Sequence, residues 1–192
     1  MKPNVLGYHC NDIERCERFV HEKGYLIWSD EKVDEQWLGK GMYFWDNLSN
    51  ANYWKNQKKK RNPDGDHRIV SAYVNLEKFL DLTDKQVYDG VERYWEMMYK
   101  KFDIQEDPEM IYIGEKLNYL FDYVEIFKKK FKVIKINAKY SNQSEIHKDL
   151  ITKKTENRPR VTNQNKTIYS VKYKSSLKGI SFVDESEERW VL

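Results

Sequence analysis

The order of strand-like and helix-like segments restricts this chain to a mixed α and β fold. Short segments with strand-like patterns lie toward both ends, at 5–9, 25–28, 37–45, 69–76, 132–139, 167–173 and 179–183. Between them, apolar residues repeat at helical spacing over 84–102 and 114–131. Strands at both ends with helices between them are typical of an α+β domain, and that is the fold class we expect.

Two more helices are expected among the N-terminal strands, because polar residues suited to helix N-caps precede helical patterns there. These residues are Asn11, Asp12, Asp46, Asn47 and Ser49. The first helix is predicted at 12–23, where Gly24 can end it. The second ends in the basic run 58–61, since positive charge favours a helix C-terminus. The stretch 29–36 is predicted to be a loop, and 141–160 a helix followed by a loop.

Length and composition indicate one folded domain over residues 1–192. With 40% hydrophobic and 15% aromatic residues, the chain can bury a substantial core. Its 34 basic residues face 31 acidic ones, so the net charge of +3 excludes a strong global field for nucleic acid. Without a signal peptide or an apolar run of membrane-spanning length, we expect a cytoplasmic protein with Cys10 and Cys16 as free thiols. His67 and His147 lack partners at zinc spacing, so no metal is expected.

Two short motifs carry the functional signal. The segment 39–54 reads GKGMYFWDNLSNANYW, and a second segment, Gly7-Tyr8-His9-Cys10-Asn11, precedes it on the first predicted strand. The longer segment closely resembles poly(ADP-ribose) polymerases, which have Gly-Lys-Gly, an apolar residue, Tyr-Phe, and a helix that ends in Ala-Asn-Tyr. One residue of that pattern is missing between Ser49 and Ala51. The shorter segment is similar to the family's Tyr/Trp-His-Gly motif, and the two motifs cover little more than 20 of the 192 residues.

This resemblance, to ADP-ribosyltransferases of the diphtheria-toxin and poly(ADP-ribose) polymerase type, implies a fold and a set of roles. The fold is a split β-sheet with an inserted helical middle section, and NAD is the ADP-ribose donor. His9 would hold a ribose hydroxyl, and Tyr43 and Tyr53 would stack on the two faces of the nicotinamide ring. The backbone of Cys10 would bind the carboxamide, and Asn50 falls where the family has a serine that contacts it. The implied NAD-binding residues are Tyr8, His9, Cys10, Asn11, Gly41, Tyr43, Asn50 and Tyr53.

These residue types also suit the chemistry itself. Cleavage of the glycosidic bond of NAD passes through an oxocarbenium-like transition state, so an enzyme must grip the amide, stack the ring and hold the ribose. Aromatic faces attract a cationic ring, and a histidine can accept from a hydroxyl. Each residue has a structural alternative as well: a partly buried histidine for His9, an aromatic core strand for 43–45, and a simple turn for Gly39 and Gly41. The chain has no P-loop and no Rossmann glycine fingerprint.

At the third position of the family's His-Tyr-Glu triad, this sequence departs from the family pattern. No glutamate directly precedes the late strand 167–173. Gln164 is the nearest suitable residue, Thr167 is a second candidate, and Glu156 is a third if the strand begins earlier. Because chain elongation relies on the glutamate, the sequence favours transfer of a single ADP-ribose.

The acceptor is expected to be a macromolecule, with nucleic acid such as single-stranded RNA slightly favoured over protein. The reasons are the local basic runs and the many aromatic residues. The compact size resembles stand-alone toxins of toxin–antitoxin and phage-defence systems, which implies an antitoxin partner. Alternatives are an NAD glycohydrolase, transfer to a small molecule, and an inactive binding module that retains the fold.

Overall fold

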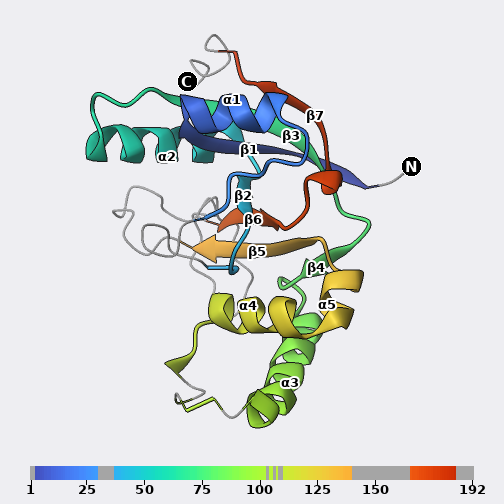
Figure 1. Cartoon of the computed structure of the whole chain (residues 1–192). Coiled ribbons are helices and arrows are strands. Elements are labelled where there is room, and N and C mark those ends of the chain that lie inside the picture. The colour runs from blue at the N-terminus through green and yellow to red at the C-terminus, as the bar shows by residue number, and fades with distance from the viewer. Residues whose placement is uncertain are drawn as a thin grey trace, which may run out of the picture.

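The computed structural model describes residues 3–29, 37–102, 104–105, 107, 110–139 and 165–184. Figure 1 shows a sheet with helices on its sides and a separate group of helices at one end. The strands are β1 (Asn4–Asp12), β2 (Met42–Trp45), β3 (His67–Asn75), β4 (Phe79–Asp81), β5 (Val133–Lys139), β6 (Asn165–Val171) and β7 (Leu177–Phe182). The helices are α1 (Ile13–His21), α2 (Leu48–Arg61), α3 (Lys85–Phe102), α4 (Ile113–Tyr123), α5 (Glu125–Lys130) and the short 3-10 helix η2 (Lys174–Ser176). The expected α+β class is confirmed.

The seven strands form one sheet in the order β4-β5-β6-β2-β1-β3-β7. The pairing of β4 with β5 is parallel, and the other neighbours are antiparallel. The strands β1 and β3 pair along nine residues, and β2 and β6 along four. In contrast, within the described chain β1 and β2 are joined by one residue pair, Tyr8 with Trp45. The sheet therefore consists of two sections, β1-β3-β7 and β4-β5-β6-β2, that meet at this pair.

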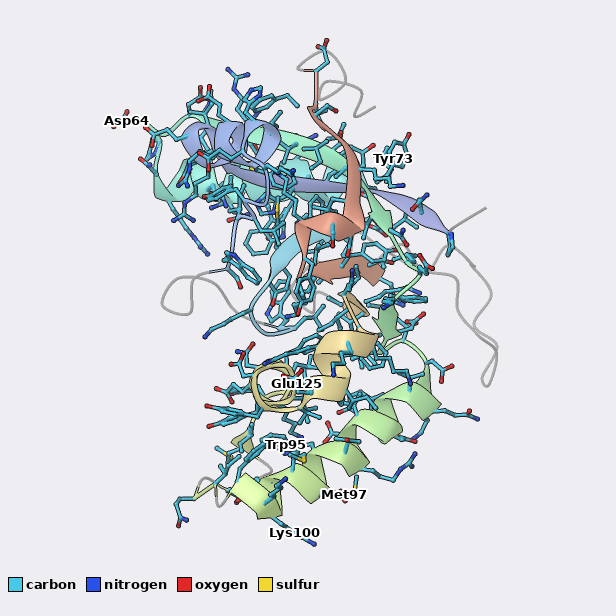
Figure 2. The ribbon with its side chains drawn as sticks, turned by 45° about the vertical axis from the view of Figure 1, so that its right-hand side comes forward. Asp64, Tyr73, Trp95, Met97, Lys100 and Glu125 are labelled. Atoms are coloured by element: carbon cyan, nitrogen blue, oxygen red, sulfur yellow. The ribbon has the colours of Figure 1, made fainter. Side chains whose placement is uncertain are left out.

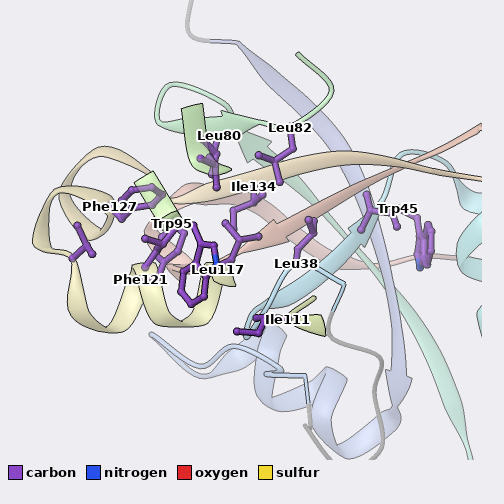
Figure 3. Packing of buried hydrophobic residues seen from close by; sticks show 14 of the residues in the cluster. Leu38, Trp45, Leu80, Leu82, Trp95, Ile111, Leu117, Phe121, Phe127 and Ile134 are labelled. Atoms are coloured by element: carbon purple, nitrogen blue, oxygen red, sulfur yellow. The ribbon is translucent and has the colours of Figure 1, made fainter. Parts of the chain in front are cut away.

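Two clusters of buried side chains fill the space around the sheet. The first core joins α3, α4 and α5 to the sheet, and Figure 3 shows its members Leu38, Trp45, Leu80, Trp95, Leu117, Phe121, Phe127 and Ile134. The second core lies beneath α1 and includes Phe19, Met42, Phe44, Val70 and Tyr169. Because side chains alternate along a strand, Met42 and Phe44 of β2 belong to the second core and Trp45 to the first.

The helices α3, α4 and α5 follow β4 and precede β5, and they pack together at one end of the molecule (Figure 1). In α3, Trp95 is 1% exposed whereas Met97 is 60% exposed, so one face of the helix meets the core and another meets solvent (Figure 2). This amphipathic pattern is what the sequence predicted for 84–102. The helical middle section is therefore anchored through the first core.

Several local expectations are corrected by the structure. The predicted helix 114–131 is two helices, because Val124 has extended backbone angles (φ −115°, ψ 98°) between α4 and α5. The segment 25–28 is irregular rather than a strand, although Leu26 and Ile27 are buried. The strand β4 was not anticipated. Residues 30–36 and 141–160 lie outside the described part of the chain, apart from Ser29 at the start of the predicted loop.

The predicted helix caps have different outcomes. Asn47 caps α2, since its Oδ1 accepts from the N–H of Asn50 at 2.9 Å. Asp12 stands at the N-cap position of α1 but makes no side-chain cap bond there. Its carboxylate instead lies 2.8 Å from Nδ1 of the buried His67. Asp12 thus contacts His67, which is distant in the sequence, instead of capping its own helix.

The two cysteines are free, as expected, and both are buried. Burial raises the pKa of the Cys16 thiol to about 11, which makes it a poor nucleophile near neutral pH. Separately, none of the helices in the described ranges combines the length and apolar character needed to cross a membrane.

Candidate functional site

His9 lies where the strands β1 and β2 part. Tyr8 pairs with Trp45, and one step along both strands the rings of His9 and Phe44 lie 5.9 Å apart. Here the imidazole bridges the two strands, because its Nδ1 lies 2.7 Å from the carbonyl oxygen of Tyr43. A carbonyl only accepts, so Nδ1 carries the proton and donates. The histidine side chain thus links the two sections of the sheet next to their single residue pair.

Asn11 fixes the other nitrogen of the same ring. Its Oδ1 accepts from the N–H of Asp12 at 2.9 Å, which turns Nδ2 toward His9. That Nδ2 lies 3.3 Å from Nε2 of His9, so Nε2 is the accepting nitrogen of a neutral imidazole. Asn11 is 7% exposed and therefore sits in a fixed environment. The two polar residues of the first motif form one unit.

Tyr43 is folded back on the loop that precedes it. Its hydroxyl donates to the carbonyl of Gly39 at 2.6 Å and accepts from the N–H of Leu38 at 3.0 Å. The ring packs against the first core, whereas the His9 ring meets Phe44 of the second core. His9 and Tyr43 are therefore in contact through the Tyr43 main chain rather than side chain to side chain.

The loop 38–41 has a backbone that suits glycine. Gly39 has φ +68°, and a Cβ there would lie 2.3 Å from Asn118 Oδ1 and 2.7 Å from the carbonyl of Gly114. At Gly41 a Cβ would lie 2.2 Å from the hydroxyl of Ser170. Gly41, a residue expected to bind NAD, is thus buried against β6. Close packing on both sides explains the Gly-x-Gly pattern.

A polar group forms on the far side of Trp45, around Asp46, which the sequence suggested only as a helix cap. Asp46 accepts from Nδ2 of Asn50 at 3.0 Å and from the N–H of Thr167 at 3.3 Å. The hydroxyl of Thr167 lies 3.2 Å from Oδ1 of Asn137. Asn50 is 6% exposed, so its amide is turned inward toward Asp46. An acidic residue between a strand and a cap residue was the only sequence signal for this role.

Three tryptophans gather where α2 meets β2. Trp45 and Trp54 are stacked with ring centres 5.9 Å apart, and Trp37 contacts both. Tyr53 of α2 sets its ring against Trp54 edge to face at 6.0 Å and is 45% exposed. This aromatic group was not anticipated as a unit, because its members come from three separate segments.

The predicted residues therefore fall into two neighbouring groups. The first group lies on one side of the Tyr8 and Trp45 pair and contains His9, Asn11, Tyr43 and the loop 38–41. The second group follows Trp45 in the chain, where Asp46 binds both Asn50 and Thr167. Cys10 is 5% exposed and belongs to the first core, with Tyr8 packed against it. Gln164 and Glu156 lie outside the described residues.

The bridging bond of His9 gives a stability prediction. His9→Ala leaves the Tyr43 carbonyl without its donor, so the free energy of unfolding should fall by about 1–3 kcal/mol. His9→Asn is the matched control, because an amide nitrogen can stand near the position of Nδ1 and still donate. Urea denaturation should show His9→Asn close to wild type. Equal losses in the two variants would mean that the bond to Tyr43 contributes little.

Comparisons with known proteins identify no relative: no family model, no curated protein and no solved structure matches the chain. Among the residues that the structure describes, no group of three or more His, Cys, Asp or Glu side chains could hold a metal ion.

Proposed function

We propose that this protein is an NAD-dependent mono-ADP-ribosyltransferase of the split-sheet type, with its donor site where β1 and β2 part. One observation carries the proposal. His9 and Tyr43 come from the two motifs that suggested the family, and Nδ1 of His9 lies 2.7 Å from the main-chain carbonyl of Tyr43, beside the one residue pair that joins the two sheet sections in the described chain. The family resemblance implied a split sheet, and the two sections of this sheet support the proposal.

The side chains in the first group have roles that follow from their contacts. With Nδ1 donating to Tyr43, Nε2 of His9 presents a lone pair that can accept from a ribose hydroxyl in place of the 3.3 Å contact with Asn11. The hydroxyl of Tyr43 fixes its half-buried ring, which we assign to the stacking of nicotinamide. A fixed ring costs less ordering free energy on binding than a mobile one.

The reaction we propose is a displacement at C1′ of the nicotinamide ribose. The bond from C1′ to the nicotinamide nitrogen breaks, and its electron pair leaves with neutral nicotinamide. A nucleophile of the acceptor forms the new bond to C1′ and loses its proton to solvent or to a neighbouring base. His9 and Tyr43 orient the sugar and the leaving ring, which raises the rate by holding the reacting atoms in place.

Gln164 is our choice for the third triad position. The alternative, Thr167, is already bound on three sides: its N–H and its carbonyl both contact Asp46, and its hydroxyl contacts Asn137. The hydroxyl proton of Thr167 is therefore already used by Asn137, which leaves only the acceptor lone pairs of this side chain for a substrate. Gln164 directly precedes β6, so it can orient the ribose or the acceptor by hydrogen bonds.

For the acceptor we propose a nucleic acid, with single-stranded RNA favoured over protein. The support comes from the basic residues Lys58, Lys59, Lys60 and Arg61 at the end of α2 and from exposed aromatic rings such as Trp28 and Tyr73. Exposed aromatic rings stack on bases, and basic side chains contact phosphates. A toxin of a toxin–antitoxin or phage-defence system, held in check by an antitoxin, is the biological role that we infer.

The experiment combines the purified protein with NAD labelled on its adenylate phosphate, in the presence of total RNA or of cell proteins. We expect nicotinamide release together with label in RNA that ribonuclease removes. Label in protein would show that the acceptor is a protein instead of RNA. Release of nicotinamide without transferred label would indicate a glycohydrolase. No nicotinamide under any condition would refute the proposal. His9→Asn, which keeps the bridge but lacks Nε2, should be inactive although folded.

A further inference from the structure

Lys172 is a buried lysine that the proposed function leaves without a role. It directly follows β6 and is 8% exposed. Its Nζ donates to the carbonyl of Leu38 at 3.0 Å and also to the carbonyl of Lys40. The ring of Phe121 lies on its other side, with its centre 5.2 Å from Nζ. The ammonium group is thus enclosed between α4 and the loop 38–41.

The loop 38–41 is the element on which these contacts converge. Tyr43 holds it through its hydroxyl, Asn118 accepts from the N–H of Lys40 at 2.6 Å, and Lys172 binds two of its carbonyls. Of the three, only Lys172 brings a formal charge. Hydrogen bonds from a charged donor are about twice as strong as neutral ones, so Lys172 is the strongest restraint.

The loop backbone also lies next to the ammonium group. A Cβ on Gly41 would lie 3.5 Å from Nζ, which is van der Waals contact, in addition to its clash with Ser170. Together with the two carbonyl bonds, this places Nζ directly against the loop. This geometry connects a residue after β6 to the aromatic ring that we assign to NAD.

We propose that Lys172 is a positioning residue of the candidate site, whose ammonium group fixes the loop 38–41 and thereby the Tyr43 ring. The part that concerns NAD rests on the proposed function. The part that concerns the loop does not, and it can be measured without NAD.

The charge on Lys172 is sensitive to pH near neutrality. Burial lowers the pKa of its ammonium group to about 7, and the nearby carboxylate of Asp122 on α4 opposes this shift. Phe121 contributes a ring, and the loop contributes the carbonyls of Leu38 and Lys40. Below pH 7 the ammonium group therefore holds the loop, and above pH 7 a neutral amine holds it less strongly.

The first part of the test follows the loop in the protein without NAD. Amide shifts of Gly39 and Gly41, and the Cε shift of Lys172 in lysine-labelled protein, are recorded by NMR between pH 5.5 and 8.5. We expect all three to change with one midpoint near pH 7. In Lys172→Met the transition of the loop amides should vanish. A Lys172 Cε transition that leaves the Gly39 and Gly41 amides unchanged overturns the proposal, and this comparison needs no variant to fold. If Cε shows no transition below pH 8.5, loop amide shifts in Lys172→Met that equal those of the wild type overturn it.

The second part measures NAD affinity over the same range. The dissociation constant of the wild type should rise by about tenfold from pH 6 to pH 8.5, and Lys172→Met should bind weakly with no such dependence. A loop that titrates while NAD affinity stays constant would overturn the positioning role. If the wild type binds no NAD at any pH, the proposed function fails. The loop titration, which is measured without NAD, then still decides whether Lys172 positions the loop.

Discussion

Gly39→Ala is expected to lower the free energy of unfolding by about 3 kcal/mol or more. The backbone at Gly39 has φ +68°, which costs a residue with a Cβ about 1–2 kcal/mol. The added Cβ would also lie 2.3 Å from Asn118 Oδ1 and 2.7 Å from the carbonyl of Gly114. Because one of these atoms is α4 backbone, the loop itself must move. Urea denaturation measures the loss.

Gly24→Ala is the control that separates backbone strain from the clash. Gly24 also has a positive φ, of +86°, but nothing lies within 4 Å of a Cβ there. It should lose only about 1–2 kcal/mol. Similar losses for Gly24→Ala and Gly39→Ala would contradict the close packing of the loop 38–41 on α4.

Tyr43→Ala is expected to abolish transfer from NAD and to weaken NAD binding by about tenfold or more, since a stacking face for a cationic ring contributes about 1–2 kcal/mol. Tyr43→Phe keeps the ring but removes the hydroxyl that bonds Gly39 and Leu38, so its main loss should be about 1–3 kcal/mol in stability. Calorimetric titration with NAD and denaturation of each variant give the two quantities.

Tyr123→Ala is the matched control for loss of a tyrosine. Tyr123 lies on α4, is 64% exposed and packs on Tyr119 and Phe102. Its removal should leave NAD affinity unchanged. Normal NAD affinity in a folded Tyr43→Ala protein would remove Tyr43 from the site.

The elements that could be predicted from the sequence are those with a local signal. Asn47 predicted the start of α2, and the apolar spacing of 84–102 predicted α3. The break at Val124 was missed because apolar residues continue at helical spacing on both sides of it. The strand β4 was missed because three residues are too few to show a pattern, and it is defined by its parallel pairing with β5.

The site was predictable in its residues but not in its contacts. Sequence motifs identified His9 and Tyr43, but the bridge between a ring nitrogen and a main-chain oxygen depends on where two distant strands diverge. The roles of Asp46 and Lys172 were missed for a related reason. A charged residue beside a strand is usually exposed, and only the tertiary fold shows that these two bind Thr167 and the loop 38–41.

The central claim is that NAD binds where β1 and β2 part, and NMR shift mapping with NAD tests it most directly. On titration of the labelled protein with millimolar NAD, we expect saturable changes in the amides of His9, Cys10, Gly41 and Tyr43. The exposed end of α3, which carries Met97 and Lys100 (Figure 2), should stay unchanged. Saturable shifts confined to α3, α4 and α5, or no shifts at all, would contradict the account.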